Sequence, residues 1–414
     1  MSLATKSTPV VAPAPTPAGS LPRRRLGFAL TGAASTLMLT GASAPSPFYP
    51  ELEERLGIGA IGVTVAFAIY AVALLIALLT VGSISDHLGR RPVIAVGFVL
   101  LAVAVLMLWR ADSGGVLYLA RVVQGLASGA LISTLSATIA DFAPPARPQN
   151  ATLLNTLAPM GGLALGTIIA GVLLQTVADA ATWTFVPLAV AYLLIAALIF
   201  TVLETSPRER GWMAALRPRA SVPAAARKLF GVSVPIVLAG WATGGLFFSL
   251  GPSIVHAELG VSSELGAALV VGVLPASGAV AAFALYRRRP IVPAVYGAVA
   301  LAAGTAIMLL ALVLGSLPVY VVAVVVAGTG FGTAFMGTIG SLVPLTTQHE
   351  RAELFAALYI VSYLSFGVPA VIAGLLTSAI GLHLTVLLYG AVVALAAGVA
   401  SVLRARTGTV AATA

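Results

Sequence analysis

One arginine lies inside an apolar run that is long enough to cross a membrane. Arg121 belongs to a predicted helix at 116–140, and Gln124, Gly125 and Ser128 follow it on one face at helical spacing. A charge in hydrocarbon is costly unless it faces a partner or water, so this position predicts a functional role for the side chain. The alternative is that the side chain extends back to the membrane surface, which is only about 8 Å of helix rise away.

Side chains that serve enzymes as nucleophiles or metal ligands are scarce in this sequence. Cysteine is absent, which excludes disulfides, thiolate metal sites and a cysteine nucleophile. The four histidines are too scattered along the chain to match the spacing of metal ligands; they are His87, His256, His349 and His383. We find no Ser/His/Asp arrangement, no nucleotide-binding loop and no paired carboxylates inside an apolar run. We therefore expect a protein that is not an enzyme and holds no metal and no cofactor.

The elements that position Arg121 are apolar helices of membrane-spanning length. Of the 414 residues 59% are hydrophobic and 8% are charged, with a mean hydropathy of +1.06, whereas a soluble domain carries about 25% charged residues. A span needs about 20 apolar residues, so the chain has room for about a dozen spans. Charged residues, prolines and glycines separate the apolar runs and so predict twelve helices, at 26–47, 60–83, 93–110, 116–140, 151–176, 183–203, 229–255, 264–285, 293–314, 318–345, 352–379 and 382–403.

The basic residues indicate which side of the membrane each loop faces. Nineteen of the 22 Lys and Arg residues fall in the two tails or in alternate loops on one side, whereas only Arg55 and Arg110 fall on the other. The positive-inside rule therefore places both termini in the cytoplasm. A nucleic-acid-binding patch would not alternate in this way, so the net charge of +9 does not indicate a nucleic-acid partner.

A polar stretch and an internal repeat divide the chain into two halves. Residues 204–228 form the longest polar break, with six predicted helices on each side. At an offset of 203 residues three separated segments recur, namely Leu56-Gly57 with Leu259-Gly260, Gly125 and Gly129 with Gly328 and Gly332, and Ile169-Ala170-Gly171 with Ile372-Ala373-Gly374. We expect an all-α membrane protein with a disordered cytoplasmic tail at 1–25, six-helix bundles at 26–203 and 229–404, a cytoplasmic linker at 204–228 and a second tail at 405–414.

The turn between the second and third predicted helices carries the most specific motif. It reads Gly82-Ser83-Ile84-Ser85-Asp86-His87-Leu88-Gly89-Arg90-Arg91-Pro92. Asp86 can pair with Arg90 or face a helix N-terminus. The segment resembles the signature of the major facilitator superfamily, a glycine, three residues and then Asp-Arg-x-Gly-Arg-Arg, with His87 in place of the first arginine. The resemblance implies a conformational latch, with the start of the eleventh helix near Arg351 as its partner, formed by Gly82, Asp86, Gly89, Arg90 and Arg91.

The equivalent turn of the second half reads Tyr286-Arg287-Arg288-Arg289-Pro290. It keeps the arginines but lacks the acid. We therefore expect a complete latch only in the N-terminal half.

Three further segments resemble motifs of the same superfamily. Arg121, Gln124 and Gly125 match its Arg-x-x-x-Gly motif, which the resemblance associates with proton coupling or substrate. The run from Gly162 to Gly171 is similar to the antiporter motif of drug exporters, with Thr167 in place of its proline. This similarity implies that the bundles pack together at Gly162, Gly166 and Gly171. Small-residue packing inside one bundle explains the run as well. Gly41 followed by Pro47-Phe48-Tyr49-Pro50 is similar to a pattern of twelve-helix exporters.

Polar and aromatic residues at helical spacing predict faces that line a cavity between the bundles. The candidates are Thr36, Thr40, Asn155, Trp241, Phe248, Tyr359 and Tyr363. A helix contact or an anchor at the membrane surface is the alternative for each of them. No acidic residue lies deep inside a predicted helix, since Asp141, Glu264 and Glu353 fall at helix ends, and this favours a neutral or anionic cargo.

The resemblance implies the major facilitator fold, in which two pseudo-symmetric six-helix bundles hold a substrate between them and expose it to alternate sides. We expect proton-coupled efflux of a drug or metabolite across a bacterial inner membrane. The expected partners are a small-molecule substrate, protons and the lipid bilayer, and the expected state is a monomer. Two alternatives stay open: a proton-coupled importer of a small organic acid or nutrient, and a membrane sensor that transports nothing.

Overall fold

The described part of the chain is built from helices. The structure is a computed structural model that describes residues 21–412 except 145, 148, 209, 210, 212, 214, 215 and 217–219. Within these residues twelve helices are long and apolar enough to cross a membrane, and no strand is present. The first half runs through α1 (Leu21–Ser43), η1 (Ser46–Phe48), α2 (Tyr49–Leu56), α3 (Gly59–Val81), α4 (Ile84–Leu88), α5 (Arg90–Trp109), α6 (Gly114–Phe142), α7 (Gln149–Thr176), α8 (Ala180–Leu198) and η2 (Ile199–Thr201). The second half runs through α10 (Ala224–Leu259), α11 (Glu264–Leu285), α12 (Ile291–Leu314), α13 (Leu317–Leu342), η3 (Val343–Leu345), α14 (Gln348–Ile380) and α15 (Leu382–Ala412).

The twelve predicted spans are confirmed in number and order, and the main differences lie at the two ends of the chain. Prolines at 45 and 47 interrupt the first span, so that α1 ends at Ser43 and the chain continues as η1 and α2. At the other end α15 continues to Ala412, into the segment predicted as a tail. Residues 1–20 of the predicted N-terminal tail lie outside the described residues, and residues 21–25 belong to α1.

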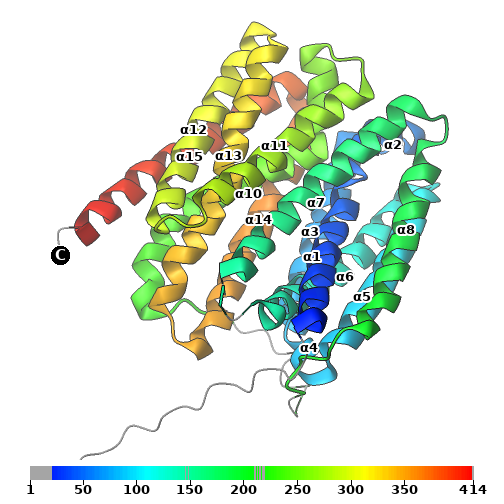
Figure 1. The fold of residues 1–414 in the computed structure, drawn as a ribbon. Coiled ribbons are helices and arrows are strands. Elements are labelled where there is room, and N and C mark those ends of the chain that lie inside the picture. The colour runs from blue at the N-terminus through cyan, green and yellow to red at the C-terminus, as the bar shows by residue number, and fades with distance from the viewer. Residues whose placement is uncertain are drawn as a thin grey trace, which may run out of the picture.

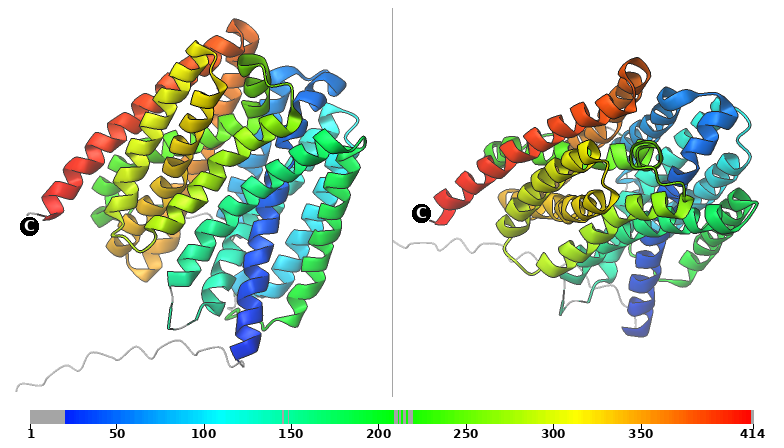
Figure 2. Two further views of the ribbon diagram at one scale, coloured as in Figure 1. Left: turned by 45° about the horizontal axis from the view of Figure 1, so that its top comes forward. Right: turned by 90° about the horizontal axis from the view of Figure 1, so that it is seen from above.

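The spans pack as two groups of six that follow the order of the chain (Figures 1 and 2). One large hydrophobic core joins helices of the first group and a second core joins helices of the second. The groups meet along two main crossings, α3 against α14 and α7 against α11. Figure 1 shows these four helices in the middle of the molecule.

Glycines of the internal repeat take equivalent places in the two groups. Gly57 ends α2 and Gly260 ends α10, with φ of 61° and 65°, left-handed values that favour glycine. Gly171 approaches α11, and Gly374, its counterpart 203 residues later, approaches α3. A Cβ built on either glycine would lie only 2.1 Å from an atom of the other group. The repeat in the sequence therefore corresponds to a repeated contact between the groups.

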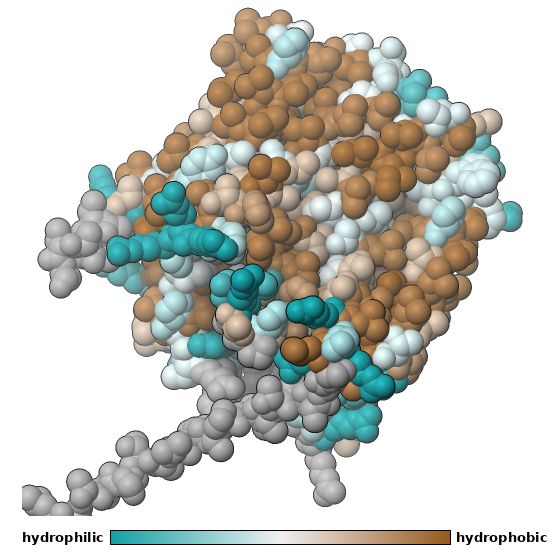
Figure 3. Space-filling model, in the orientation of Figure 1, coloured by the Kyte–Doolittle hydropathy of each residue, from teal (hydrophilic) through white to brown (hydrophobic). Residues whose placement is uncertain are grey.

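The two ends of the molecule carry different features. We call them the α4 end, where α4 and the starts of α1, α5 and α14 lie, and the α2 end, where α2 and the α10–α11 turn lie (Figure 1). Between the ends, large apolar side chains such as Val96, Leu194 and Val392 are exposed. Figure 3 shows a broad apolar surface there. Such a surface suits contact with lipid rather than water.

Candidate functional site

Arg121 of α6 is enclosed by polar and aromatic groups of the first bundle. Only 2% of the residue is exposed. Its Nη1 donates a hydrogen bond to Gln124 Oε1 at 2.5 Å, and its Nη2 donates to the hydroxyl of Tyr49. Gln124 Nε2 in turn donates to the carbonyl of Gly41 at 2.8 Å. Since these bonds hold the guanidinium inside the bundle, the alternative in which it reaches the membrane surface does not hold.

The charge of Arg121 is only partly compensated. Among the described residues, no carboxylate lies within ion-pair distance of it. Its guanidinium carbon lies 5.8 Å from the ring centroid of Tyr70, and its Nε is buried without a hydrogen-bond partner. A desolvated cation is costly unless acceptors or opposite charge surround it. The arrangement therefore leaves a positive site and one donor that an anion or a hydrogen-bond acceptor could satisfy.

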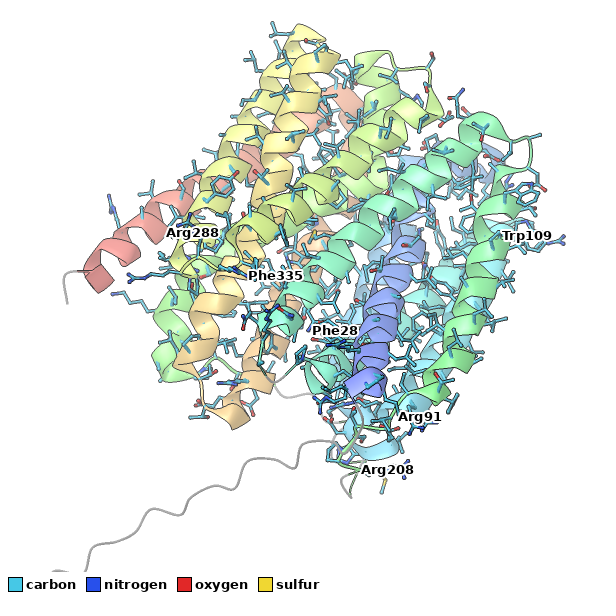
Figure 4. The ribbon with its side chains drawn as sticks, viewed as in Figure 1. Phe28, Arg91, Trp109, Arg208, Arg288 and Phe335 are labelled. Carbon is cyan, nitrogen blue, oxygen red and sulfur yellow. The ribbon has the colours of Figure 1, made fainter. Side chains whose placement is uncertain are left out.

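The facing side of the second bundle is aromatic. Six rings from α10, α13 and α14 touch one another, and we call them the aromatic cluster: Trp241, Phe335, Phe355, Tyr359, Tyr363 and Phe366. The ring centroid of Trp241 lies 5.0 Å from that of Tyr363 and 5.6 Å from that of Phe335, which Figure 4 labels near the middle of the molecule. The ring centroid of Phe366 lies 4.6 Å from that of Phe67 in α3, so the cluster also contacts the first bundle. Ring faces and edges of this kind suit a flat apolar ligand.

The structure places the predicted cavity residues in different surroundings. Trp241, Tyr359 and Tyr363 belong to the aromatic cluster. Phe248 is 3% exposed and packs in the core of the first bundle, so it fills a contact between bundles.

The three polar candidates of the first bundle make contacts inside that bundle. The hydroxyls of Thr36 and Thr40 donate to carbonyls one turn earlier in α1, at 3.1 and 2.9 Å. The amide of Asn155 donates to the carbonyl of Ser136 in α6 at 3.4 Å. Their side chains thus have local partners in this conformation.

The predicted packing role of the helix-5 glycines holds for only one of them. A Cβ on Gly162 would lie 2.3 Å from the carbonyl oxygen of Thr36, and one on Gly166 would lie 2.0 Å from that of Thr40. Both glycines therefore pack α7 against α1 inside the first bundle, and their assignment to the contact between bundles is wrong. Five residues turn a helix by about 140° beyond a full turn, so Gly171 faces the other neighbour, α11.

The turn between α3 and α5 forms an ion-paired network at the α4 end. Arg90 Nη1 lies 2.6 Å from Asp86 Oδ1, and Arg90 Nε lies 3.4 Å from Asp141 Oδ2 at the end of α6. Glu204 accepts hydrogen bonds from the backbone N–H groups of Arg90 and Arg91 at 2.8 and 3.2 Å. A carboxylate at the first turn of α5 also suits the helix dipole. The network joins α4, α5, α6 and the segment after η2.

Sequence reasoning missed two members of this network and one expected contact is not seen. Asp141 and Glu204 lie far from Arg90 in the chain, and their only signal was an acid directly after a predicted span. Gly89 takes a φ of 109°, as a tight turn requires. Among the described residues no ion pair joins Asp86 to Arg351, so the contact with the eleventh helix that the resemblance implies is not present in this conformation.

Polar contacts gather at the α2 end as well. Ser263 Oγ at the α10–α11 turn donates to Gln175 Oε1 of α7 at 3.0 Å, which joins the two bundles. Nearby, His256 Nε2 lies 3.4 Å from Glu264 Oε2. The Ser263–Gln175 hydrogen bond and the Gly171 and Gly374 contacts thus bring the two bundles together at the α2 end, whereas the His256–Glu264 pair lies within the second bundle.

Known proteins resemble the chain in sequence. The family described as Major Facilitator Superfamily matches residues 31–368. The puromycin resistance protein pur8 of Streptomyces alboniger is 29% identical over 38% of this chain and 31% of its own length. The multidrug resistance protein MdtL of Shewanella sp. (strain ANA-3) is 24% identical over 51% of this chain and 53% of its own length. The matched region thus spans about a third to a half of these relatives.

Solved structures share the fold over nearly the whole chain. A bacterial homologue of the human lysosomal transporter Spinster, in an inward-facing and occupied conformation, is 14% identical with a TM-score of 0.74 and covers 94% of this chain and 98% of its own. The human organic anion transporter MFSD10 is 17% identical with a TM-score of 0.68 and covers 91% and 99% of the two chains. At such identities the likeness shows the fold alone.

Proposed function

Because the chain belongs to the major facilitator superfamily, and because its bundles meet beside a buried arginine and an aromatic cluster, we propose that it exports a flat, neutral or anionic small molecule in exchange for protons. The chain is a multi-pass membrane transporter of this family rather than an enzyme. Efflux, proton coupling and cargo are what the proposal adds.

The proposal rests on one observation: the buried charge of Arg121 and the aromatic cluster lie next to each other across the contact between the bundles. Tyr70 of α3 faces Arg121 in the first bundle and packs in one hydrophobic cluster with Tyr363, Trp241 and Phe366. A ligand that stacks on the aromatic cluster therefore approaches Arg121, a cation of the first bundle that is only 2% exposed. No acid among the described residues balances that cation, which disfavours a cationic cargo.

The arrangement of contacts supports alternating access with the site open toward the cytoplasm in this conformation. Gly171, Gly374 and Ser263 bring the bundles together at the α2 end. The positive-inside rule assigns the α4 end, with its many arginines, to the cytoplasm. Rocking of the bundles would then close the α4 end, where the Asp86–Arg90 network lies, and open the α2 end.

Arg121 does not carry the transported proton itself. A guanidinium stays protonated at every physiological pH. In the proposal Arg121 binds a hydrogen-bond acceptor. This acceptor belongs either to the cargo or to a protein group that gains and loses a proton, so that proton binding and cargo binding compete for the same conformation of the transporter. The side chains of Gln124 and Tyr49 orient the guanidinium for that task.

The test is transport in proteoliposomes of the full chain under an imposed pH gradient. The panel compares flat aromatic compounds of equal size that are neutral, anionic or cationic. We expect gradient-driven movement of the neutral or anionic members opposite to the proton flux, and its loss when an ionophore collapses the gradient. Transport of the cation alone, or transport that ignores the gradient, contradicts the proposal.

A second candidate is import of a small organic acid together with protons. The buried Nε of Arg121 without a partner favours it, because a carboxylate could accept from that donor. The same proteoliposomes separate the two functions, since an importer moves cargo and protons in the same direction. The sensor alternative predicts no flux at all.

A further inference from the structure

The turn between α11 and α12 exposes three consecutive arginines, Arg287, Arg288 and Arg289. Among the described residues no carboxylate lies within ion-pair distance of any of them. In the equivalent turn of the first bundle, by contrast, Arg90 is paired with two carboxylates. Figure 4 places Arg288 at the side of the molecule, and Figure 3 shows hydrophilic atoms there next to apolar surface. The α11–α12 turn thus presents three adjacent cations without a carboxylate, whereas carboxylates compensate Arg90 in the first-bundle turn.

Apolar surface begins directly after the arginines. Ile291, Val292, Val295 and Tyr296 line an open hollow of about 410 Å³ at the start of α12. Val292, Tyr296 and Val299 are 43%, 42% and 51% exposed, and their spacing of four and three residues puts them on one face of the helix. This face leads from the arginines into the membrane-spanning part of α12.

Two aromatic rings lie beside the arginines of this turn. Phe283 and Tyr286 stack with centroids 5.9 Å apart. Arg287 Cζ lies 5.2 Å from the Tyr286 ring, and its Nε donates to the Tyr286 hydroxyl at 2.7 Å. Tyrosine rings concentrate at the boundary between hydrocarbon and water, and Tyr286 together with the arginines beside it therefore suits the level of lipid phosphates.

We propose that this turn binds an anionic phospholipid, with its phosphate at Arg287, Arg288 and Arg289 and an acyl chain along the hollow of α12. Charge complementarity selects an anionic headgroup, because a zwitterionic lipid brings no net charge to three uncompensated cations. The hollow selects a lipid over free phosphate, because a bare anion would leave the face of Val292 and Tyr296 unused. The site does not depend on the cargo proposed above.

The test measures binding of phosphatidylglycerol to the full chain in phosphatidylcholine nanodiscs. The variant Arg287→Gln/Arg288→Gln/Arg289→Gln is expected to bind it about 100-fold more weakly, since each basic side chain contributes roughly fivefold. The matched control, Arg23→Gln/Arg25→Gln/Lys228→Gln, removes three exposed cations from the same end of the molecule and should bind as the parent does. An equal loss in the control, or no loss in the first variant, overturns the proposal.

A second variant separates lipid from free anion. Val292→Trp keeps all three charges and fills the hollow, and it should weaken binding of long-chain phosphatidylglycerol about tenfold without changing the thermal unfolding of the protein. Inorganic phosphate at millimolar concentration should fail to displace the lipid. Complete displacement by phosphate, or unchanged binding in Val292→Trp, would replace the lipid site with a free-anion site and sink the proposal. Arg288→Gln alone, expected to lose about fivefold, serves if the triple variant does not fold.

Discussion

The two bundles share packing contacts but differ in the residues that they present at the proposed site. At the offset of 203 residues, Arg121 and Gln124 of α6 correspond to Val324 and Ala327 of α13, so the second bundle has no buried cation at this place. In the other direction, Trp241 of the aromatic cluster corresponds to Met38 of α1. We therefore propose that the first bundle contributes the charge at the central site and that the second contributes the rings.

At some of the repeated glycines the backbones of neighbouring helices touch. Gly125 lies against the Tyr70 carbonyl of α3, and its counterpart Gly328 lies against the Leu274 carbonyl of α11. A Cβ built on these glycines would lie 2.5 and 2.4 Å from the two carbonyl oxygens. No side chain fits at such a distance, so packing fixes these residues in both halves. Positions that face the centre carry no such constraint, and there the halves can specialise.

Removing the charge of the first bundle should have the largest effect. Arg121→Met is expected to lower gradient-driven transport about 10- to 100-fold, because hydrogen bonds to a buried charged group are lost. Arg121→Lys keeps the charge without the planar fork and should fall between. Initial rates in proteoliposomes measure both. Arg110→Met, which removes a cation stacked on Trp109, is the control and should transport normally. Normal proton-coupled transport in Arg121→Met would contradict the proposal that the first bundle supplies a charge needed for transport.

Bulk at the repeated crossing should shift the conformation. In Gly374→Leu the new side chain meets Thr64 of α3, whose Oγ1 lies 2.1 Å from a built Cβ, so the α2 end cannot close and transport should fall roughly tenfold. Gly171→Leu should act in the same way at Ala268 if the halves are equivalent there. Because the chain has no cysteine, label pairs can be introduced without background, and the distance across the α2 end should increase. Gly398→Leu, with open space around it, should change neither distance nor rate.

The sequence predicts the architecture better than the site. Apolar length predicts the spans, and the internal repeat predicts two related halves, because both can be read from one sequence without knowing which helices touch. The sequence does not show which neighbouring helix each glycine faces. For this reason the prediction places Gly162 at the contact between bundles, whereas it packs against α1 of its own bundle. Glu204 and Phe335 were missed for a related reason: their partners come from other spans, and one sequence does not show which helices lie side by side.

Truncation of the aromatic cluster should affect affinity more than rate. Trp241→Ala removes the ring that contacts Tyr363, Phe335 and Phe366, and it is expected to raise KM for an aromatic cargo about tenfold with a smaller change in kcat. Trp241→Phe should restore part of the loss. The counterpart substitution Met38→Ala in the first bundle should leave KM within about twofold. Equal effects at the two positions would show that the cargo does not distinguish the bundles.

The ion-paired network should tolerate the loss of one acid. Asp86→Asn should change transport only a few-fold, because the Asp86 side chain is 34% exposed and Arg90 keeps Asp141 as a second carboxylate. Asp141→Asn alone should behave similarly, because Arg90 keeps one carboxylate in each case. The double variant leaves Arg90 without either and should lose more than the two single effects combined. Strict additivity of the initial rates would mean that the three residues do not act together.

The smallest effect is expected at the start of α14, where the halves again differ. Glu350 accepts hydrogen bonds from the backbone N–H and hydroxyl of Thr347, both at 2.9 Å, and its counterpart in the first half is Arg147. These bonds lower the pKa of Glu350 below its ordinary value. The capping contact therefore stabilises the fold above the ordinary glutamate pKa of about 4.3 and is lost as the pH falls through the lower folded value. Glu350→Gln should lower the melting temperature slightly at pH 7, and the difference from the parent should vanish at acid pH. Glu54→Gln is the control for an exposed carboxylate, and a pH-independent difference at Glu350 would attribute the effect to helix packing instead of the cap.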